Sequence, residues 1–248
     1  MKPALAFAQL KKPKTWQDMS SGLLIKKHIE KSLEPWWQRA FGYHMLKLGQ
    51  LSSQIESQQA KIPHQINVCE SPLVADVVAE IDDLPFVQQS IDLCLLTLQL
   101  EYAVDPHHIL READRVLIAN GYMVIAGINP WSLAGVNKLI PYRRQQLPWQ
   151  GRFFTPMRVK DWLNLLGYEI VDDQRILFSG LHNKQRDDRW WFKKLQTIGQ
   201  SYLPLFCSVY VIVAKKRVQP LTPIRPKWQL RHKFRPINVS TIGQNRHI

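Results

Sequence analysis

Aromatic and basic side chains alternate in a stretch that has no acidic residue between Asp114 and Asp161. Between Asn129 and Thr155 its aromatic residues and arginines are Trp131, Tyr142, Arg143, Arg144, Trp149, Arg152, Phe153 and Phe154. Aromatic rings can stack on nucleic-acid bases while arginines contact phosphates, so residues 138–160 are a candidate nucleic-acid surface. The same side chains could instead cover an apolar, quinone-like small molecule, or pack on the domain as a structural lid.

The positive charge of the chain is concentrated near its C-terminus. The formal net charge is +13, and residues 215–248 hold nine lysines and arginines and no acidic residue. Such a basic tail favours an anionic partner, either nucleic acid or an acidic lipid surface. A solvated tail that keeps the protein soluble is the alternative.

Cysteine usage and hydropathy indicate a cytoplasmic protein. Cys69, Cys94 and Cys207 have no spacing that suits zinc, so we expect no metal site, and their odd number argues against a disulfide framework. Small buried thiols in a reducing compartment are the better interpretation. The longest apolar runs, such as residues 209–214, are too short to span a bilayer, and the N-terminus lacks the apolar segment of a signal peptide. We therefore expect no membrane span and no secretion.

Short apolar runs bounded by polar or turn residues predict seven strands. They are residues 43–48, 65–69, 77–81, 91–98, 122–128, 168–171 and 207–214. Helical spacing of apolar residues predicts a helix over 22–37 and another that begins at Thr155 and Pro156 and stops at Gly167. Residues 52–59 are polar and compatible with a helix.

The stretch from Leu84 to Trp131 carries the clearest pattern. Residues 91–98 are almost continuously apolar, which is typical of a strand covered on both faces. Asp105 can cap a helix whose first residue is Pro106, where the missing N–H costs nothing. We expect Gly121 to end this helix before the next buried strand.

Strands that alternate with helices predict an α/β three-layer sandwich. We expect a mostly parallel, seven-stranded, Rossmann-like sheet with an antiparallel edge strand. The predicted organisation is an N-terminal helical extension over 1–40, a main domain over 41–214 and a basic, Pro-containing tail over 215–248.

The central residues resemble those of the class I S-adenosylmethionine-dependent methyltransferases, most closely the type 11 domain group. The likeness rests on Leu84-Pro85-Phe86, on Ser90-Ile91-Asp92-Leu93, on Leu110-Arg111-Glu112-Ala113-Asp114-Arg115-Val116-Leu117, and on Gly121. It extends over roughly residues 43–214 and is strongest in the middle third. It implies a methyltransferase that uses S-adenosylmethionine on an unknown acceptor. The alternative is a catalytically inactive, methyltransferase-like binding protein that engages RNA or another anionic partner.

The resemblance also implies where the cofactor would bind. Gly49 and Gln50, after the first strand, would lie against the methionine portion, although the family usually has several glycines where this chain has Leu48-Gly49-Gln50-Leu51. Lys47 stands near the position where the family often has an acidic residue. Glu70, 21 positions after Gly49, would accept hydrogen bonds from the ribose hydroxyls.

Residues after the third and fourth strands complete the implied site. Glu80 and Ile81 would contact the adenine, and Asp82 or Asp83 could replace Glu80 in this role. Leu98 would face the cleft after the fourth strand.

Catalytic residues are harder to assign, and Glu101 and His107 are the candidate bases. Tyr102 could form a wall of the acceptor pocket. The alternatives are helix-entry packing for Glu101 and Tyr102, and an exposed first-turn position for His107.

Overall fold

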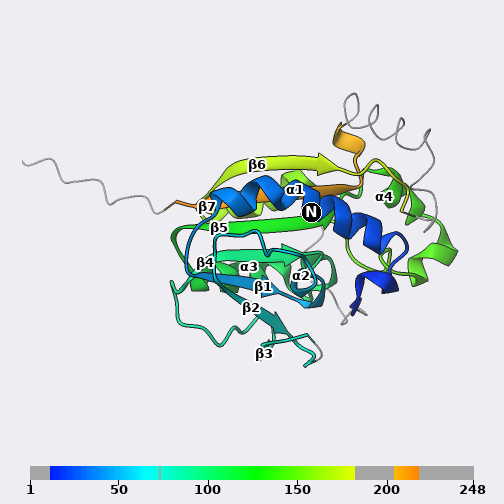
Figure 1. Ribbon diagram of the computed structural model, residues 1–248. Helices are drawn as coiled ribbons and strands as arrows, with labels where there is room; N and C mark the ends of the chain where they lie inside the picture. The colour runs from blue at the N-terminus through cyan, green and yellow to red at the C-terminus, as the bar shows by residue number, and fades with distance from the viewer. Residues whose placement is uncertain (1–11, 73, 182–203, 218–248) are drawn as a thin grey trace, which may run out of the picture. The chain divides into compact units, whose positions relative to one another are not determined.

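The structure is a computed structural model that describes residues 12–72, 74–181 and 204–217. The strands are β1 (His44–Leu48), β2 (His64–Cys69), β3 (Val77–Val78), β4 (Ile91–Thr97), β5 (Leu117–Ile128), β6 (Tyr168–Ile176) and β7 (Val209–Lys216). The α-helices are α1 (Gly22–Arg39), α2 (Gln50–Ser53), α3 (Pro106–Val116), α4 (Leu133–Asn137) and α5 (Pro156–Leu165), as Figure 1 shows. Short 3₁₀ helices are η1 (Trp16–Asp18), η2 (Leu100–Tyr102), η3 (Pro141–Gln145) and η4 (Pro204–Phe206).

The seven strands form one sheet in the order β3-β2-β1-β4-β5-β7-β6. The first five strands pair in parallel, and β7 pairs antiparallel with both β5 and β6. The predicted fold class is therefore confirmed, with β7 lying one position inside the edge strand β6. After β3 the chain returns to the other side of β1, so the strand order reverses between β1 and β4. Ligands of open α/β sheets bind at such a point, beyond the carboxyl ends of the strands.

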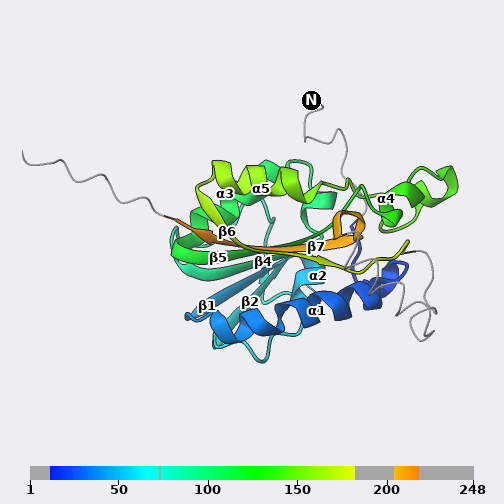
Figure 2. The ribbon, with the colours of Figure 1, turned by 90° about the horizontal axis from the view of Figure 1, so that it is seen from above.

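Helices cover both faces of the sheet, with α1 and α2 on one face and α3 and α5 on the other (Figure 2). Alternate residues of β4 contribute to two separate cores. Leu93 and Leu95 belong to the core under α1, whereas Cys94 and Leu96 belong to the core under α3 and α5. Burial on both faces explains why the predicted fourth strand is apolar throughout.

The N-terminal helix α1 is attached to the far edge of the sheet. Trp36 Nε1 donates to Asp172 Oδ2 at 2.8 Å, and Ser32 Oγ donates to Gln174 Oε1 at 2.6 Å. Both acceptors lie on β6, so α1 packs across the antiparallel side of the sheet. The described residues up to Arg217 belong to one compact unit. Most of the predicted basic tail lies outside the described residues.

Gly121 does not end helix α3, and that prediction is wrong. The helix ends at Val116, whose carbonyl accepts a hydrogen bond from Ser90 N, and β5 begins at Leu117. Gly121 lies within β5, at an irregularity where the pairing steps from Ile91–Leu117 to Leu93–Tyr122. A Cβ on Gly121 would lie 2.9 Å from the carbonyl oxygen of Asp92, so the glycine permits close approach of two strands.

The bounds of α2, β3 and β6 also differ from the prediction. Helix α2 covers only Gln50–Ser53, because the following turn is held by Gln65, whose Nε2 donates to the carbonyl of Ser57 at 3.0 Å. Strand β3 has two residues and β6 extends to Ile176. The cysteines are three buried free thiols, as predicted.

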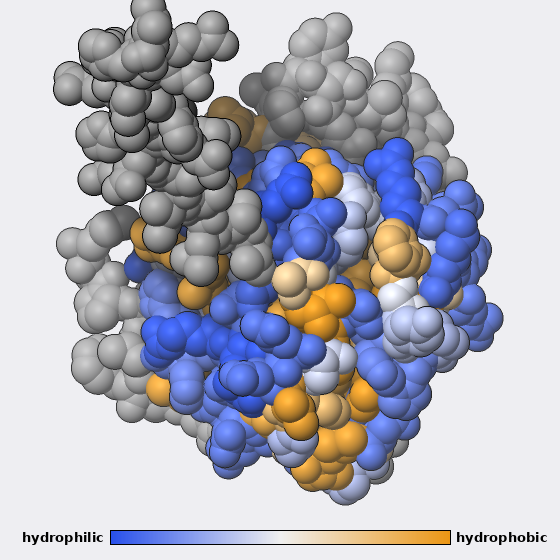
Figure 3. Space-filling view, turned by 90° about the vertical axis from the view of Figure 1, so that its left-hand side faces the viewer, coloured by the Kyte–Doolittle hydropathy of each residue, from blue (hydrophilic) through white to orange (hydrophobic). Residues whose placement is uncertain are grey.

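The amino ends of the parallel strands form the face turned to the viewer in Figure 3. Hydrophilic residues dominate this face, with a hydrophobic patch among them. Exposed apolar side chains that precede strands at this end include Phe41, before β1, and Val87, before β4. Among the described helices, none has the length and apolar character that a bilayer crossing requires.

Replacing Asp105 with alanine should lower the free energy of unfolding by about 1 kcal/mol. The Asp105 carboxylate accepts a hydrogen bond from His107 N at 2.9 Å and so caps α3, as the sequence predicts. Chemical denaturation measures the loss. The control is Asp161→Ala on the exposed face of α5, which should change stability by less than about 0.5 kcal/mol. Equal effects of the two variants would contradict the capping role.

Candidate functional site

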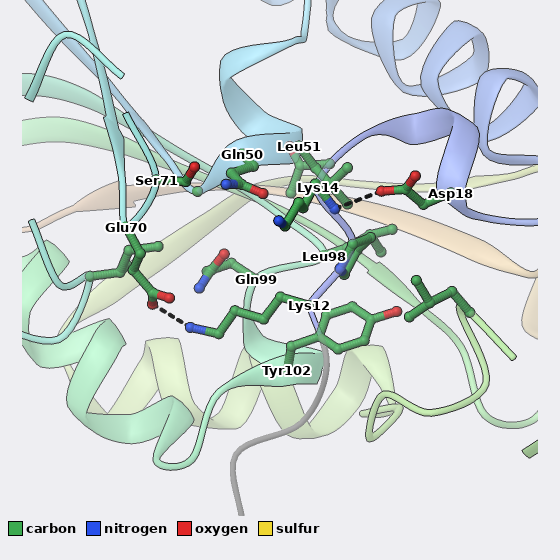
Figure 4. A pocket seen from close by; sticks show the side chains of 15 residues that line it. Lys12, Lys14, Asp18, Gln50, Leu51, Glu70, Ser71, Leu98, Gln99 and Tyr102 are labelled. Carbon is green, nitrogen blue, oxygen red and sulfur yellow. Dashed lines mark hydrogen bonds and ion pairs between the residues drawn. The ribbon is translucent and has the colours of Figure 1, made fainter. Parts of the chain in front are cut away.

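A pocket of about 820 Å³ opens at the carboxyl ends of β1, β2 and β4 (Figure 4). It lies where the strand order reverses. Residues from six separate segments line it: Lys12, Pro13, Lys14, Asp18, Gly49, Gln50, Leu51, Glu70, Ser71, Ile81, Thr97, Leu98, Gln99, Tyr102 and Leu147. Of the six residues predicted to bind a cofactor, all except Glu80 line this pocket.

Gly49 makes the turn from β1 into α2. Its φ is 91° and its ψ is 160°, a conformation that is essentially restricted to glycine. Its N–H donates to Val68 O at 2.8 Å, and a Cβ at this position would lie only 2.2 Å from Gln99 Oε1. The absence of a side chain therefore keeps space between the ends of β1 and β4.

Glu70 follows β2 and points its carboxylate into the pocket, where it forms an ion pair with Lys12 (Figure 4). The Glu70 side chain is 37% exposed. A carboxylate that is open to solvent and to the pocket can accept hydrogen bonds from a ligand's hydroxyl groups. Lys12 was not among the predicted site residues.

Ile81 is buried beside Gly49, and it lines both the main pocket and a smaller neighbouring pocket of about 350 Å³. Glu80 and Asp82 line the smaller pocket, which Glu70 also joins. Asp83 lines neither of these two pockets. The structure thus places Glu80 next to the main pocket and gives Ile81 the position of an apolar wall.

The chain after β4 crosses the floor of the pocket. Leu98 adopts a positive φ of 51°, and its N–H donates to Ala126 O at 2.9 Å. Gln99 is only 8% exposed, and its Nε2 has no hydrogen-bond partner within the described residues. Buried donors are normally satisfied, so this amide is suited to an acceptor oxygen of a ligand.

Neither candidate base lines the two pockets. Glu101 is 1% exposed and lies beneath the pocket, where Oε1 accepts a hydrogen bond from Ile128 N at 2.9 Å. Burial raises the pKa of this carboxyl group to about 7. His107 lies on the first turn of α3 with its ring 4.3 Å from that of Trp162, and burial lowers its pKa. Tyr102 does line the main pocket, as predicted, and its hydroxyl donates to Pro148 O at 3.2 Å.

The aromatic and basic stretch packs on the domain. Trp149 and Phe154 are buried, and the Trp149 indole donates to Ala134 O at 2.9 Å. The guanidinium of Arg143 lies 5.8 Å from the Trp149 ring, and that of Arg152 lies 5.6 Å from the Phe154 ring. These ring faces are therefore covered by the protein itself, which favours the structural lid among the three alternatives.

Two other aromatic residues of this stretch, Trp131 and Tyr142, are exposed. Phe153 is partly buried and carries the Lys138 ammonium 4.6 Å from its ring centre. The side chain of Arg144 lies outside the described part of the structure.

The segment from Lys12 to Asp18 is the part of the site that sequence reasoning missed. Lys12 and Lys14 line the pocket although no expected helix or strand includes them. The available signal was the cluster of lysines before Trp16, but nothing in its spacing indicates which part of the sheet it covers.

Comparison with known proteins defines the class. Residues 36–125 match the family model described as a methyltransferase domain. A methyltransferase from Archaeoglobus fulgidus described as SAM dependent aligns with a TM-score of 0.55 at 17% identity, covering 77% of this chain and 94% of that one. A SAM-dependent, possible histamine N-methyltransferase from Thermotoga maritima aligns with a TM-score of 0.54 at 16% identity, covering 79% and 93%. The match over residues 36–125 and the shared fold support a class I S-adenosylmethionine-dependent methyltransferase.

The chain is also similar to the Escherichia coli K12 protein named "Uncharacterized protein YafS". The two are 39% identical over 235 residues, which is 95% of this chain and 93% of the relative. The chain therefore belongs to the same family as that protein. A second relative, "Uncharacterized protein MJ1123" of Methanocaldococcus jannaschii, is 28% identical over 42% of this chain and 50% of its own length.

The pocket residues fit S-adenosylmethionine, the cofactor of this class. Glu70 offers a carboxylate for a ribose diol, and Ile81 offers an apolar surface for an adenine ring. Gln99 offers an amide donor that lacks a partner among the described residues. Gly49 leaves room for a ligand where any side chain would obstruct it.

Proposed function

We propose that the protein is a methyltransferase that transfers the methyl group of S-adenosylmethionine to a nucleophilic acceptor. The observation that carries the proposal is the meeting of Gly49 and Glu70 in one pocket at the reversal of strand order. In this proposal Glu70 binds the ribose hydroxyls, Ile81 contacts the adenine, and Gly49, Gln50 and Leu98 lie along the methionine portion. Glu80 borders the adenine end from the smaller pocket.

S-adenosylmethionine supplies a methyl group on a positively charged sulfur, and the protein contributes mainly position. Tyr102 and Leu147 contribute an aromatic and an aliphatic side chain to the pocket lining, against which an acceptor can lie. Burial raises the pKa of Tyr102, so its phenol stays neutral and keeps its hydrogen bond to Pro148. We assign Glu101 and His107 no contact with the acceptor, because neither lines the pocket. In this proposal neither residue acts as a general base. The acceptor atom therefore attacks the methyl group with a lone pair that needs no deprotonation by Glu101 or His107.

The decisive experiment is a calorimetric titration of the purified protein with S-adenosylmethionine and with S-adenosylhomocysteine, its demethylated product. We expect saturable binding of both. Absence of heat at high micromolar cofactor would refute the proposal. Transfer of a labelled methyl group to a fractionated cell extract would then identify the acceptor class. The three buried free thiols support a reducing, cytoplasmic setting for this activity.

Replacing Glu70 with alanine should weaken cofactor binding by about tenfold, because it removes an anionic acceptor of hydrogen bonds. It should leave stability nearly unchanged, since the ion pair with Lys12 is partly exposed and such pairs contribute little. Calorimetry with S-adenosylhomocysteine measures the affinity. Glu34→Ala, on the exposed face of α1, is the matched control. Equal affinities of the two variants would remove Glu70 from the cofactor site.

The competing function is an inactive, methyltransferase-like protein that binds an anionic partner. The net charge of +13 and the single glycine after β1 support it. It predicts RNA binding that weakens steeply with salt and that falls when residues 218–248 are removed, together with no cofactor binding.

A further inference from the structure

The N-terminal segment Lys12–Asp18 lies over the cofactor pocket and comes from outside the part of the chain that matches the methyltransferase family model. Four of its residues, Lys12, Pro13, Lys14 and Asp18, line the pocket. The segment therefore adds positive charge to a site whose glycine turn is reduced to Gly49.

The backbone of Lys14 is fixed on both sides. Its N–H donates to Asp18 Oδ2 at 2.8 Å, and its carbonyl accepts from Gln54 Nε2 at 2.9 Å. The next turn is anchored by Trp16, which is 1% exposed and donates from Nε1 to Leu51 O at 3.1 Å. Because Gln54 and Leu51 belong to the turn and helix that follow Gly49, the segment is attached to the same element that forms the pocket's glycine turn.

The two lysines differ in their partners. The Lys12 ammonium is engaged with Glu70, whereas the Lys14 ammonium has no ion pair or hydrogen bond within the described residues. Figure 4 shows Lys14 beside Gln50 and Leu51, on the opposite side of the pocket from Glu70. A cation that lines a pocket without a partner is suited to a ligand's anionic group.

S-adenosylmethionine has one anionic group, the carboxylate of its methionine portion, and two cationic groups, the ammonium and the sulfonium. If Glu70 holds the ribose, the methionine portion extends from there past Gly49 toward Lys14. The lysine would repel the sulfonium or the ammonium and attract only the carboxylate.

We propose that the segment Lys12–Asp18 closes the methionine end of the cofactor pocket and that the ammonium of Lys14 pairs with the cofactor's carboxylate. This inference rests on the proposed function. Asp18 and Gln54 are positioning residues, since they hold the backbone from which Lys14 reaches the pocket. The segment thereby places a positive charge next to the turn at Gly49, where it can pair with the carboxylate of the methionine portion.

The test is calorimetry on the full chain with two probes, S-adenosylmethionine and its decarboxylated form, which keeps the sulfonium and the ammonium but lacks the carboxylate. Lys14→Met should weaken binding of S-adenosylmethionine by about tenfold. It should leave binding of the decarboxylated probe unchanged or slightly stronger. Lys14→Arg should retain most of the affinity. Lys31→Met, on the exposed face of α1, should leave the affinity for both probes unchanged.

The outcomes separate the inference from the function beneath it. If the unchanged protein binds neither probe, the proposed function and the inference both fail. If it binds S-adenosylmethionine and Lys14→Met binds equally well, the function stands and the inference is refuted. An equal loss for both probes would refute the pairing of Lys14 with the carboxylate. Thermal denaturation of each variant shows whether the fold is retained.

Discussion

Replacing Gly49 with alanine should weaken binding of S-adenosylhomocysteine by about 100-fold and lower the free energy of unfolding by about 1–3 kcal/mol. The backbone there has a φ of 91°, which a residue with a Cβ adopts only under strain. The new methyl group would also lie 2.2 Å from Gln99 Oε1 and force that amide from its place at the pocket floor. Both effects act where the methionine portion of the cofactor is proposed to lie.

Gly167→Ala is the matched control for Gly49→Ala. Gly167 also has a positive φ, 85°, but it follows α5, and the nearest atom to an added Cβ is Arg217 O at 3.8 Å. It should lower stability by about 1 kcal/mol and leave cofactor affinity unchanged. Chemical denaturation and calorimetry measure the two quantities separately. If Gly49→Ala bound the cofactor as well as Gly167→Ala does, Gly49 would have only a structural role.

Replacing Glu101 with glutamine should remove a pH dependence of stability worth up to about 3 kcal/mol. Burial raises the pKa of Glu101 from 4.5 to about 7 in the folded protein. Between these values the folded state binds the proton more tightly than the unfolded state, so the free energy of unfolding falls as the pH rises. The buried neutral acid makes its full contribution to the free energy of unfolding below pH 4.5, and this contribution is lost above about pH 7.

The measurement is denaturant unfolding of the natural protein and of Glu101→Gln between pH 4 and 8. The stability of the variant relative to the natural protein should increase across this range, because glutamine stays neutral and its carbonyl still accepts from Ile128 N. Glu101→Leu should also lose the pH dependence. It should be less stable than Glu101→Gln at every pH, because it leaves the buried N–H of Ile128 without its acceptor. If the difference in the free energy of unfolding between the natural protein and Glu101→Gln stayed constant with pH, folding would not change the pKa of Glu101.

Much of the fold could be predicted because local spacing encodes it. The alternation of buried strands with capped helices predicted the parallel sheet, and Asp105 and Thr155 cap α3 and α5 as the sequence indicates. Gly121 was misassigned because a glycine at this position can either end a helix or allow two strands to approach closely. Only the register of β4 against β5 distinguishes the two.

The candidate site was partly predictable for the same reason. Gly49 and Glu70 directly follow strands, and the carboxyl ends of parallel strands meet at one edge of the sheet. Glu101 could not be placed from the sequence, since a carboxylate four residues after β4 can face the cleft or turn beneath it. The hydrogen bond from Ile128, on β5, decides that it turns beneath.

The sequence by itself determined the methyltransferase-like sheet, its order of elements and the positions of Gly49 and Glu70, because each depends on neighbours a few residues away. The tertiary structure alone decided that β7 lies between β5 and β6 and that Lys12, 58 positions from Glu70, meets it over the pocket. Contacts at such separations depend on how α1 packs on the sheet and carry no local spacing signal. For that reason the lysines of the N-terminal segment became part of the site only when the fold was known.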